Sequence, residues 1–175
     1  MSSVIQFFKV KEASIDLSIK SLKSKKGHEG EILHTCNIYF GKSHIATYQE
    51  YDMGAGHSVE VNTKKQKEYD NALKVLSTLS SYYCDILRQD VSVTLEDWAN
   101  EACIVSSILK TAKREKPRGY FDKIENTIRV YPKKKGTEDS FYQDHMKTMK
   151  NIIPLHTLED EEVLKLYLKY HKIKF

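Results

Sequence analysis

The chain has 175 residues and a net charge of +4, and 40% of its residues are hydrophobic while 30% are charged. This composition is too apolar for a disordered protein and too charged for one that spans a membrane, and the length suits a single domain. The N-terminal residues show neither the basic stretch nor the apolar stretch of a secretory signal, so we expect a soluble, cytoplasmic protein.

Strand patterns dominate residues 1–62. Apolar residues occupy alternate positions over 13–19, which is typical of a half-buried strand, and a basic turn is expected at 21–30. A second alternation covers 32–40, on the side chains of Ile32, Cys36, Ile38 and Phe40. The pair Gly41-Lys42 after it fits a type II′ hairpin, because glycine accepts the positive φ of the first turn position.

A glycine-rich break at 53–56 precedes a short alternation at Val59 and Val61. A capping box over 63–66, in which a Thr side chain and a Gln side chain satisfy each other's backbone amides, then predicts the start of a helix. Its apolar face would hold Tyr69, Leu73, Leu76, Ser80 and Tyr83.

The clearest amphipathic helix begins at Thr94, with Asp97 as its partner in a second capping box. Its apolar stripe contains Trp98, which we expect to be buried between this helix and the sheet. Pro117 and Gly119 end the helix. The full stripe is Leu95, Trp98, Ala102, Val105, Leu109 and Ala112.

The remaining residues predict a small hairpin over 120–131, turning at Glu125-Asn126, and then two helices. The first helix would run from Thr137 to about Asn151. The second would be capped by Thr157, with acidic residues in its first turn where they complement the helix dipole. Pro154 separates the two.

These elements predict an α+β fold: an N-terminal antiparallel sheet of three to four strands, packed on one face by helices, with a C-terminal helical pair. We expect one domain over 1–175. Its parts are strands over 1–62, two helices over 63–116, a basic hairpin and loop over 117–136, and two helices over 137–175.

The residue types do not form a catalytic or metal-binding pattern. Cys36, Cys84 and Cys103 are odd in number and widely spaced, so we expect buried, reduced thiols. The His–hydroxyl pairs, such as His34-Thr35, lack the His-x-Thr spacing that puts both side chains on one face of a strand. We predict no metal, no cofactor and no catalytic residue.

A glycine-rich segment before a helix can expose backbone amides to an anion. Gly54, Gly56, Lys64 and Lys65 are the residues that would form such a site. The pattern matches neither a Walker loop nor a dinucleotide-binding loop, and a plain strand-to-helix turn explains it as well.

Positive charge is concentrated in one segment. Residues 110–135 carry ten Lys or Arg and three Asp or Glu, a local balance of +7, while the remainder of the chain is negative. Aromatic residues among these cations are the pattern expected for phosphate contact and base stacking, although a solvated face also explains it. The candidate contacts are Lys110, Lys113, Arg114, Lys116, Arg118, Tyr120, Lys133, Lys134 and Lys135.

Several stretches resemble a set of small uncharacterised proteins from bacteriophages and prophages. They are the strand-turn-strand at 38–46, the glycine-rich element at 53–57, the helix start at 68–72, the acidic helix at 95–101 and the segment at 108–110. The resemblance covers about 8–131. It departs at the glycines and leaves the helices after Gly136 without a counterpart. It implies a phage or mobile-element origin and the cytoplasm of a bacterial host, and it supplies no activity.

The function expected from these features is non-enzymatic binding to nucleic acid, to a host nucleoprotein or to an acidic protein surface through the basic segment. Inhibition of a host defence system, as by an anti-CRISPR protein, would fit the implied origin. A nucleic-acid-processing enzyme with a dispersed active site and a structural accessory protein are the alternatives. The oligomeric state does not follow from the sequence.

Overall fold

The structure is a computed structural model that describes residues 16–79, 82–84 and 89–170, so the first part of the predicted strand at 13–19 lies outside the described residues. The chain divides into two compact units, one ending at Val105 and one covering Ser106–Lys174. Each unit contains antiparallel sheet and helix, the boundary falls within the helix over Leu95–Glu115, and the fold is of the α+β class.

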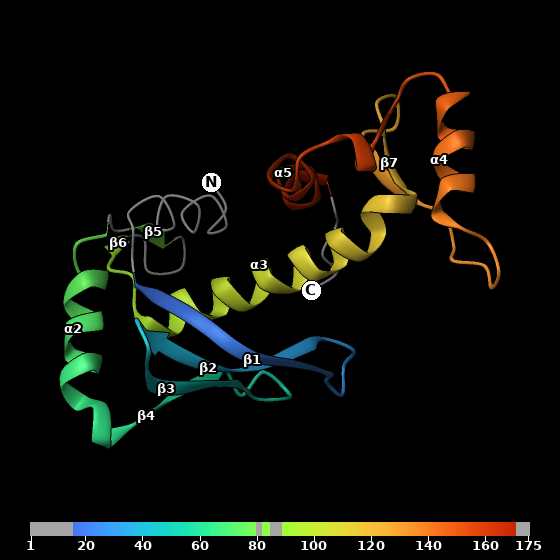
Figure 1. The fold of residues 1–175 in the computed structure, drawn as a ribbon. Coiled ribbons are helices and arrows are strands. Elements are labelled where there is room, and N and C mark those ends of the chain that lie inside the picture. The colour runs from blue at the N-terminus through green and yellow to red at the C-terminus, as the bar shows by residue number, and fades with distance from the viewer. Residues whose placement is uncertain (1–15, 80–81, 85–88, 171–175) are drawn as a thin grey trace. The chain divides into compact units, whose positions relative to one another are not determined.

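The first unit is built on a four-stranded antiparallel sheet whose strands lie in chain order (Figure 1). The strands are β1 (Leu17–Lys26), β2 (Ile32–Phe40), β3 (Ser43–Glu50) and β4 (His57–Val61). The predicted hairpin joins β2 to β3, and Gly41 has the positive φ, 58°, that the turn requires. The predicted sheet is therefore confirmed.

The prediction of a basic turn at 21–30 was wrong, because β1 continues to Lys26. Ser21 adopts a φ of 56°, and the register with β2 shifts between Lys20 and Lys23, as in a β-bulge. The extra residue lets Leu22 pack against the core. Only five residues, Gly27 to Glu31, are left to turn the chain. Ile32, the first residue of β2, is exposed, while Cys36 and Ile38 of the same predicted alternation are buried.

Helix α2 (Gln66–Leu76) follows the 3-10 turn η1 (Thr63–Lys65) and is shorter than predicted. The expected capping box at Thr63 was wrong: the side chain of Asn62 accepts from the backbone N of Lys64 at 3.2 Å. Asn62 is held in place because its Nδ2 also donates to the carbonyl oxygen of His44 at 2.9 Å.

The predicted α2 face ends early as well. Ala72 and Leu76 are the buried residues of the helix, while Leu73 is exposed. Tyr83, expected on the helix, lies in strand β5 (Tyr82–Cys84), which pairs with β6 (Gln89–Val91). Ser80 lies outside the described residues.

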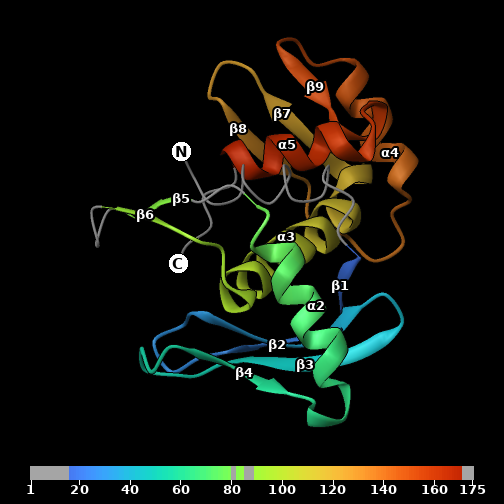
Figure 2. The same cartoon turned by 90° about the vertical axis from the view of Figure 1, so that its left-hand side faces the viewer.

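Helix α3 (Leu95–Glu115) begins as predicted. The Thr94 hydroxyl donates to Asp97 Oδ2 at 2.7 Å, and the backbone N of Asp97 donates to Thr94 Oγ1 at 3.1 Å. Its first turns and α2 lie over one face of the sheet (Figure 2). Trp98, 5% exposed, is buried there with Ile38 and Tyr48, as predicted.

The second unit contains a three-stranded sheet in the order β8-β7-β9. The predicted hairpin is confirmed as β7 (Gly119–Asp122) and β8 (Thr127–Val130). Strand β9 (Ile152–Pro154) was not predicted. Helix α3 ends at Glu115, where the turn η2 (Lys116–Arg118) with Pro117 begins. Gly119 packs closely: a Cβ there would lie 2.7 Å from Leu155 Cδ1 and 3.1 Å from the carbonyl oxygen of Glu115, so a larger residue would displace the Leu155 side chain.

Helix α4 (Asp139–Lys147) is shorter than predicted, because the chain turns at Asn151, with φ 61°, to form β9. The turn η3 (Leu155–Thr157) precedes helix α5 (Asp160–Tyr170). The prediction that Thr157 caps α5 was wrong: its hydroxyl donates to the carbonyl of Pro154 at 2.7 Å. None of the described helices is long and apolar enough to cross a membrane.

Candidate nucleic-acid interface

Three consecutive lysines lie on the segment between β8 and α4, residues 131–138, which we call the lysine loop. Lys133, Lys134 and Lys135 are all exposed. Two hydrogen bonds of Tyr142 hold the loop on α4: its hydroxyl donates to the carbonyl of Pro132 at 3.1 Å and accepts from the backbone N of Lys134 at 3.3 Å. The loop therefore presents its cations from a fixed backbone.

Arg118 fixes both ends of the lysine loop. Its Nη1 donates to the carbonyl of Tyr131 at 2.6 Å, and its Nε lies 3.7 Å from Asp139 Oδ1 at the start of α4. Only 8% of Arg118 is exposed. This predicted contact residue consequently holds the loop in place and presents little of its charge to a ligand.

A predominantly apolar pocket of about 640 Å³ opens beside the lysine loop, and we call it the aromatic pocket. It lies entirely within the second unit, over the start of α4. Its lining residues are Tyr131, Pro132, Lys134, Gly136, Thr137, Glu138, Phe141, Tyr142 and His145.

The rings of the aromatic pocket support one another. Tyr131 and Tyr142 are stacked with centroids 5.4 Å apart, and Phe141 meets Tyr142 edge-on at 5.6 Å. The Tyr131 hydroxyl lies 2.8 Å from His145 Nδ1. Burial raises the pKa of Tyr131, so this phenol is neutral at physiological pH. The pocket thus has ordered walls, and Tyr131 brings no phenolate charge to it.

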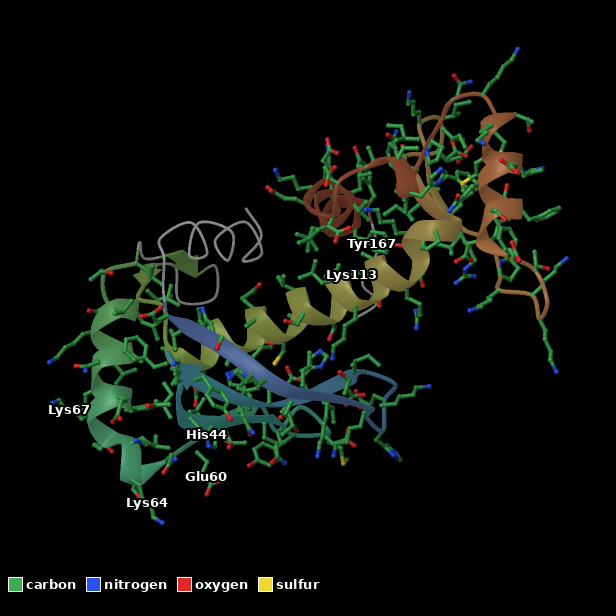
Figure 3. The ribbon with its side chains drawn as sticks, in the orientation of Figure 1. His44, Glu60, Lys64, Lys67, Lys113 and Tyr167 are labelled. Carbon is green, nitrogen blue, oxygen red and sulfur yellow. The ribbon has the colours of Figure 1, made fainter. Side chains whose placement is uncertain are left out.

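The predicted cations on α3 and η2 are mostly paired within the unit. Lys116 Nζ lies 2.7 Å and Lys113 Nζ 3.9 Å from the carboxylate of Asp160 on α5. The hydrogen bond from Lys116 and the charges of both lysines lower the pKa of Asp160. Arg114 lies 3.0 Å from Glu115. Figure 3 labels one residue of each of the two helices that these ion pairs join, Lys113 on α3 and Tyr167 on α5.

Five cations of the basic segment take part in none of the ion pairs found among the described residues: Lys110, Lys123, Lys133, Lys134 and Lys135. Three of these five lie together on the lysine loop.

Tyr120, the aromatic residue predicted to contact nucleic acid, is only 9% exposed, and its ring packs against Tyr131 with centroids 5.7 Å apart. It supports the pocket from behind and presents no open face to a base.

The structure separates the four residues of the candidate anion site. Gly54 and Gly56 lie in the turn before β4, while Lys64 and Lys65 follow its end, so a strand of five residues, about 17 Å long, stands between the pairs. Lys65 is paired with Glu68 at 3.2 Å. The pocket near the glycines is lined by Glu31 and Glu50, which disfavour an anion.

In the first unit, a serine lies beside a histidine and two cysteines lie beside each other. Ser24 Oγ lies 3.0 Å from His34 Nδ1, and the two residues are cross-strand neighbours, a relation that explains their contact without catalysis. Cys36 and Cys103 are buried, free thiols with sulfur atoms 3.4 Å apart. The side chain of Cys84 lies outside the described residues. In the described part of the chain, no three His, Cys, Asp or Glu residues are grouped to hold a metal ion.

Sequence reasoning missed the residues that α4 contributes, namely Phe141, Tyr142 and His145. A signal was available in the neighbours Phe141 and Tyr142, because adjacent positions on a helix point in different directions and a short helix buries only one of them.

Comparison with protein-family models, with curated proteins and with solved structures finds no match to this chain.

Proposed function

We propose that this protein is a non-enzymatic nucleic-acid-binding protein that contacts phosphates through the lysine loop. The observation that carries the proposal is the loop itself: three exposed lysines on a backbone held by Tyr142 and Arg118, without an ion pair among the described residues. Exposed cations without an ion pair can neutralise phosphates, which releases the counterions condensed on a polyphosphate.

The distribution of charge supports the same choice. Residues 106–174 contain sixteen Lys or Arg and ten Asp or Glu, while residues 1–105 contain twelve and fourteen. The second unit is therefore positive and the first negative, which steers a polyanion toward the second unit. Lys113, Arg114 and Lys116 add to this field, but Asp160 and Glu115 lie against them.

The test is a fluorescence-anisotropy titration of labelled single-stranded and duplex DNA and of single-stranded RNA, at a series of salt concentrations. The variant Lys133→Glu/Lys134→Glu/Lys135→Glu should bind all of them more weakly. Its plot of log affinity against log salt should be shallower than that of the wild type by about 2 to 3, because about 0.7–0.9 is lost per phosphate contact.

The matched control is Lys23→Glu/Lys67→Glu/Lys74→Glu, which changes three exposed lysines of the first unit. Figure 3 shows Lys67 on α2, pointing away from the sheet. Both triple variants change the net charge from +4 to −2. The control should retain most of the affinity. Equal losses in both variants would mean that overall charge and not the lysine loop determines binding.

The same labelled strands, incubated with and without magnesium, also separate two alternative functions. If the wild type binds no nucleic acid at low salt, an acidic protein surface becomes the proposed partner, to be sought by cross-linking from the lysine loop. If the labelled strands are cut only when magnesium is added, the protein is an enzyme. A phage origin and the inhibition of a host defence system are what the resemblance to phage and prophage proteins implies for such a binding protein.

A further inference from the structure

The aromatic pocket lies beside the lysines of the proposed phosphate contact and has a different chemistry from them. We infer that it holds an unpaired base of single-stranded nucleic acid, while the lysine loop contacts the adjoining phosphates. The inference rests on the proposed function and adds the class of nucleic acid to it.

The exposed ring of Phe141 is the surface on which a base can stack. Helix α4 buries Tyr142 and Met146 on one side and leaves Phe141 64% exposed. A single exposed aromatic ring is common in proteins. Phe141 differs because it forms the wall of a pocket and because its edge-on contact with Tyr142 restricts its orientation. Stacking on such a ring tolerates any base.

The polarity of the aromatic pocket favours a neutral ring over a phosphate. Its lining is mostly apolar, and the carboxylate of Glu138 at its edge repels an anion. Lys134 lines the same pocket, and Lys133 and Lys135 flank it in the chain. An unpaired nucleotide has the matching arrangement, since its flat base is uncharged and its phosphates lie on either side.

The shape of the site favours an unpaired base over a base pair. In a duplex both faces of a base are stacked on neighbours and its edge is paired, so a pocket cannot enclose it unless the duplex opens. A volume of about 640 Å³ lies within the range of pockets that enclose small organic ligands. Single strands offer such a base at the lowest cost.

The decisive variant is Phe141→Ala, measured in the full-length protein by anisotropy. The probes are a single-stranded DNA of about twelve nucleotides, the same sequence as RNA, the blunt duplex, and the DNA strand with abasic sites. We expect affinity for the two intact single strands to fall about 5-fold or more, the loss typical of removing one stacking ring. Affinity for the duplex and for the abasic strand should be nearly unchanged.

Two further variants control this result. Ile124→Ala removes a side chain of similar exposure, 69%, from the β7–β8 turn of the same unit, outside the pocket, and should bind like the wild type. Phe141→Trp keeps a stacking ring and should restore affinity for the intact strands. Its indole fluorescence should also be quenched by them and not by the abasic strand.

The outcomes separate the inference from the proposed function. If the lysine-loop variant loses affinity while Phe141→Ala does not, or loses it equally for duplex and single strands, the base-binding inference is wrong and phosphate binding stands. If the wild type binds none of the probes, both are wrong.

Discussion

Asp160 forms ion pairs with two lysines of the basic segment and so reduces the positive charge that the segment offers to a ligand. Its carboxylate lies 2.7 Å from Lys116 and 3.9 Å from Lys113, and it comes from helix α5, 44 residues after Lys116 in the chain. Changing Lys113, Arg114 and Lys116 together to Glu would place new carboxylates beside Asp160. Such a variant would mix ligand binding with repulsion inside the unit, so the lysine loop is the cleaner place to test phosphate contact.

The burial of Cys36 and Cys103 predicts that neither thiol reacts in the native protein. Cys36 and Cys103 are 1% and 0% exposed. The contact with Cys36 and burial raise the pKa of Cys103. The same contact lowers the pKa of Cys36, but a reagent has no access to this buried thiol. In a Cys84→Ala protein, we expect a thiol reagent at pH 8 to label neither cysteine of the native state.

The measurement is mass spectrometry before and after denaturation. Denaturant should raise the label count from none to two in the Cys84→Ala protein, since Cys36 and Cys103 are then the remaining cysteines. Rapid labelling of the native protein would contradict the burial of the pair and would show that the interior of the sheet opens readily.

The residues that cap the starts of α3 and η1 should each contribute to the free energy of unfolding. Thr94 and Asp97 satisfy each other's backbone amides at the start of α3, so Thr94→Ala should lower the free energy of unfolding by about 0.5–2 kcal/mol. Thr63→Ala should change it by less than about 0.5 kcal/mol, because the 3-10 turn η1 before α2 is capped by Asn62 and not by Thr63.

Urea titration of the two variants and of Asn62→Ala provides the measurement. Asn62→Ala should cost more than Thr63→Ala, because Asn62 both caps η1 and bonds to the carbonyl of His44. Equal losses for Thr63→Ala and Asn62→Ala would contradict the placement of the cap at Asn62.

Elements set by neighbouring residues were predictable from the sequence. The Gly41 turn and the Thr94 cap each depend on a few adjacent positions, and both were predicted correctly. Strand β9 was not predicted, because its partner β7 lies some thirty residues earlier and Ile152–Pro154 shows no alternation of its own. The bulge at Ser21 was missed because its cause is the register against β2.

The candidate site was predictable in charge and not in shape. The lysines of the loop stand out in the sequence by composition alone. The role of Arg118 depends on the Tyr131 carbonyl and on Asp139, which only the fold brings to it. The aromatic pocket likewise requires Tyr131 and Phe141 to meet across the loop.

At the scale of the whole molecule, two separate cores raise the question of how the chain unfolds. Trp98 lies in the core of the first unit with Ile38 and Tyr48, while Met146, 1% exposed, packs with Tyr120 and Tyr142 in the second. The sequence predicted a single domain, whereas the contacts cluster into two compact units. Two such units can unfold together or one at a time.

Truncating one residue in each core tests this point. Trp98→Ala should lower the free energy of unfolding by about 3–5 kcal/mol, and Met146→Ala by about 2–5 kcal/mol, the ranges for such side chains in close-packed cores. If the units are separate cooperative units, amide exchange in Trp98→Ala should quicken in β1–β4 and stay slow in β7–β9. Met146→Ala should show the reverse.

Hydrogen exchange followed by mass spectrometry resolves the two sheets by peptide, and Trp98→Phe offers a milder change if the alanine variant does not fold. Exchange that quickens equally in both sheets, in both variants, would show one cooperative unit over the whole chain and support the single domain expected from the sequence. Exchange confined to β1–β4 in Trp98→Ala would show that the unit carrying the lysine loop keeps its structure while the other opens, and exchange confined to β7–β9 in Met146→Ala would show the converse.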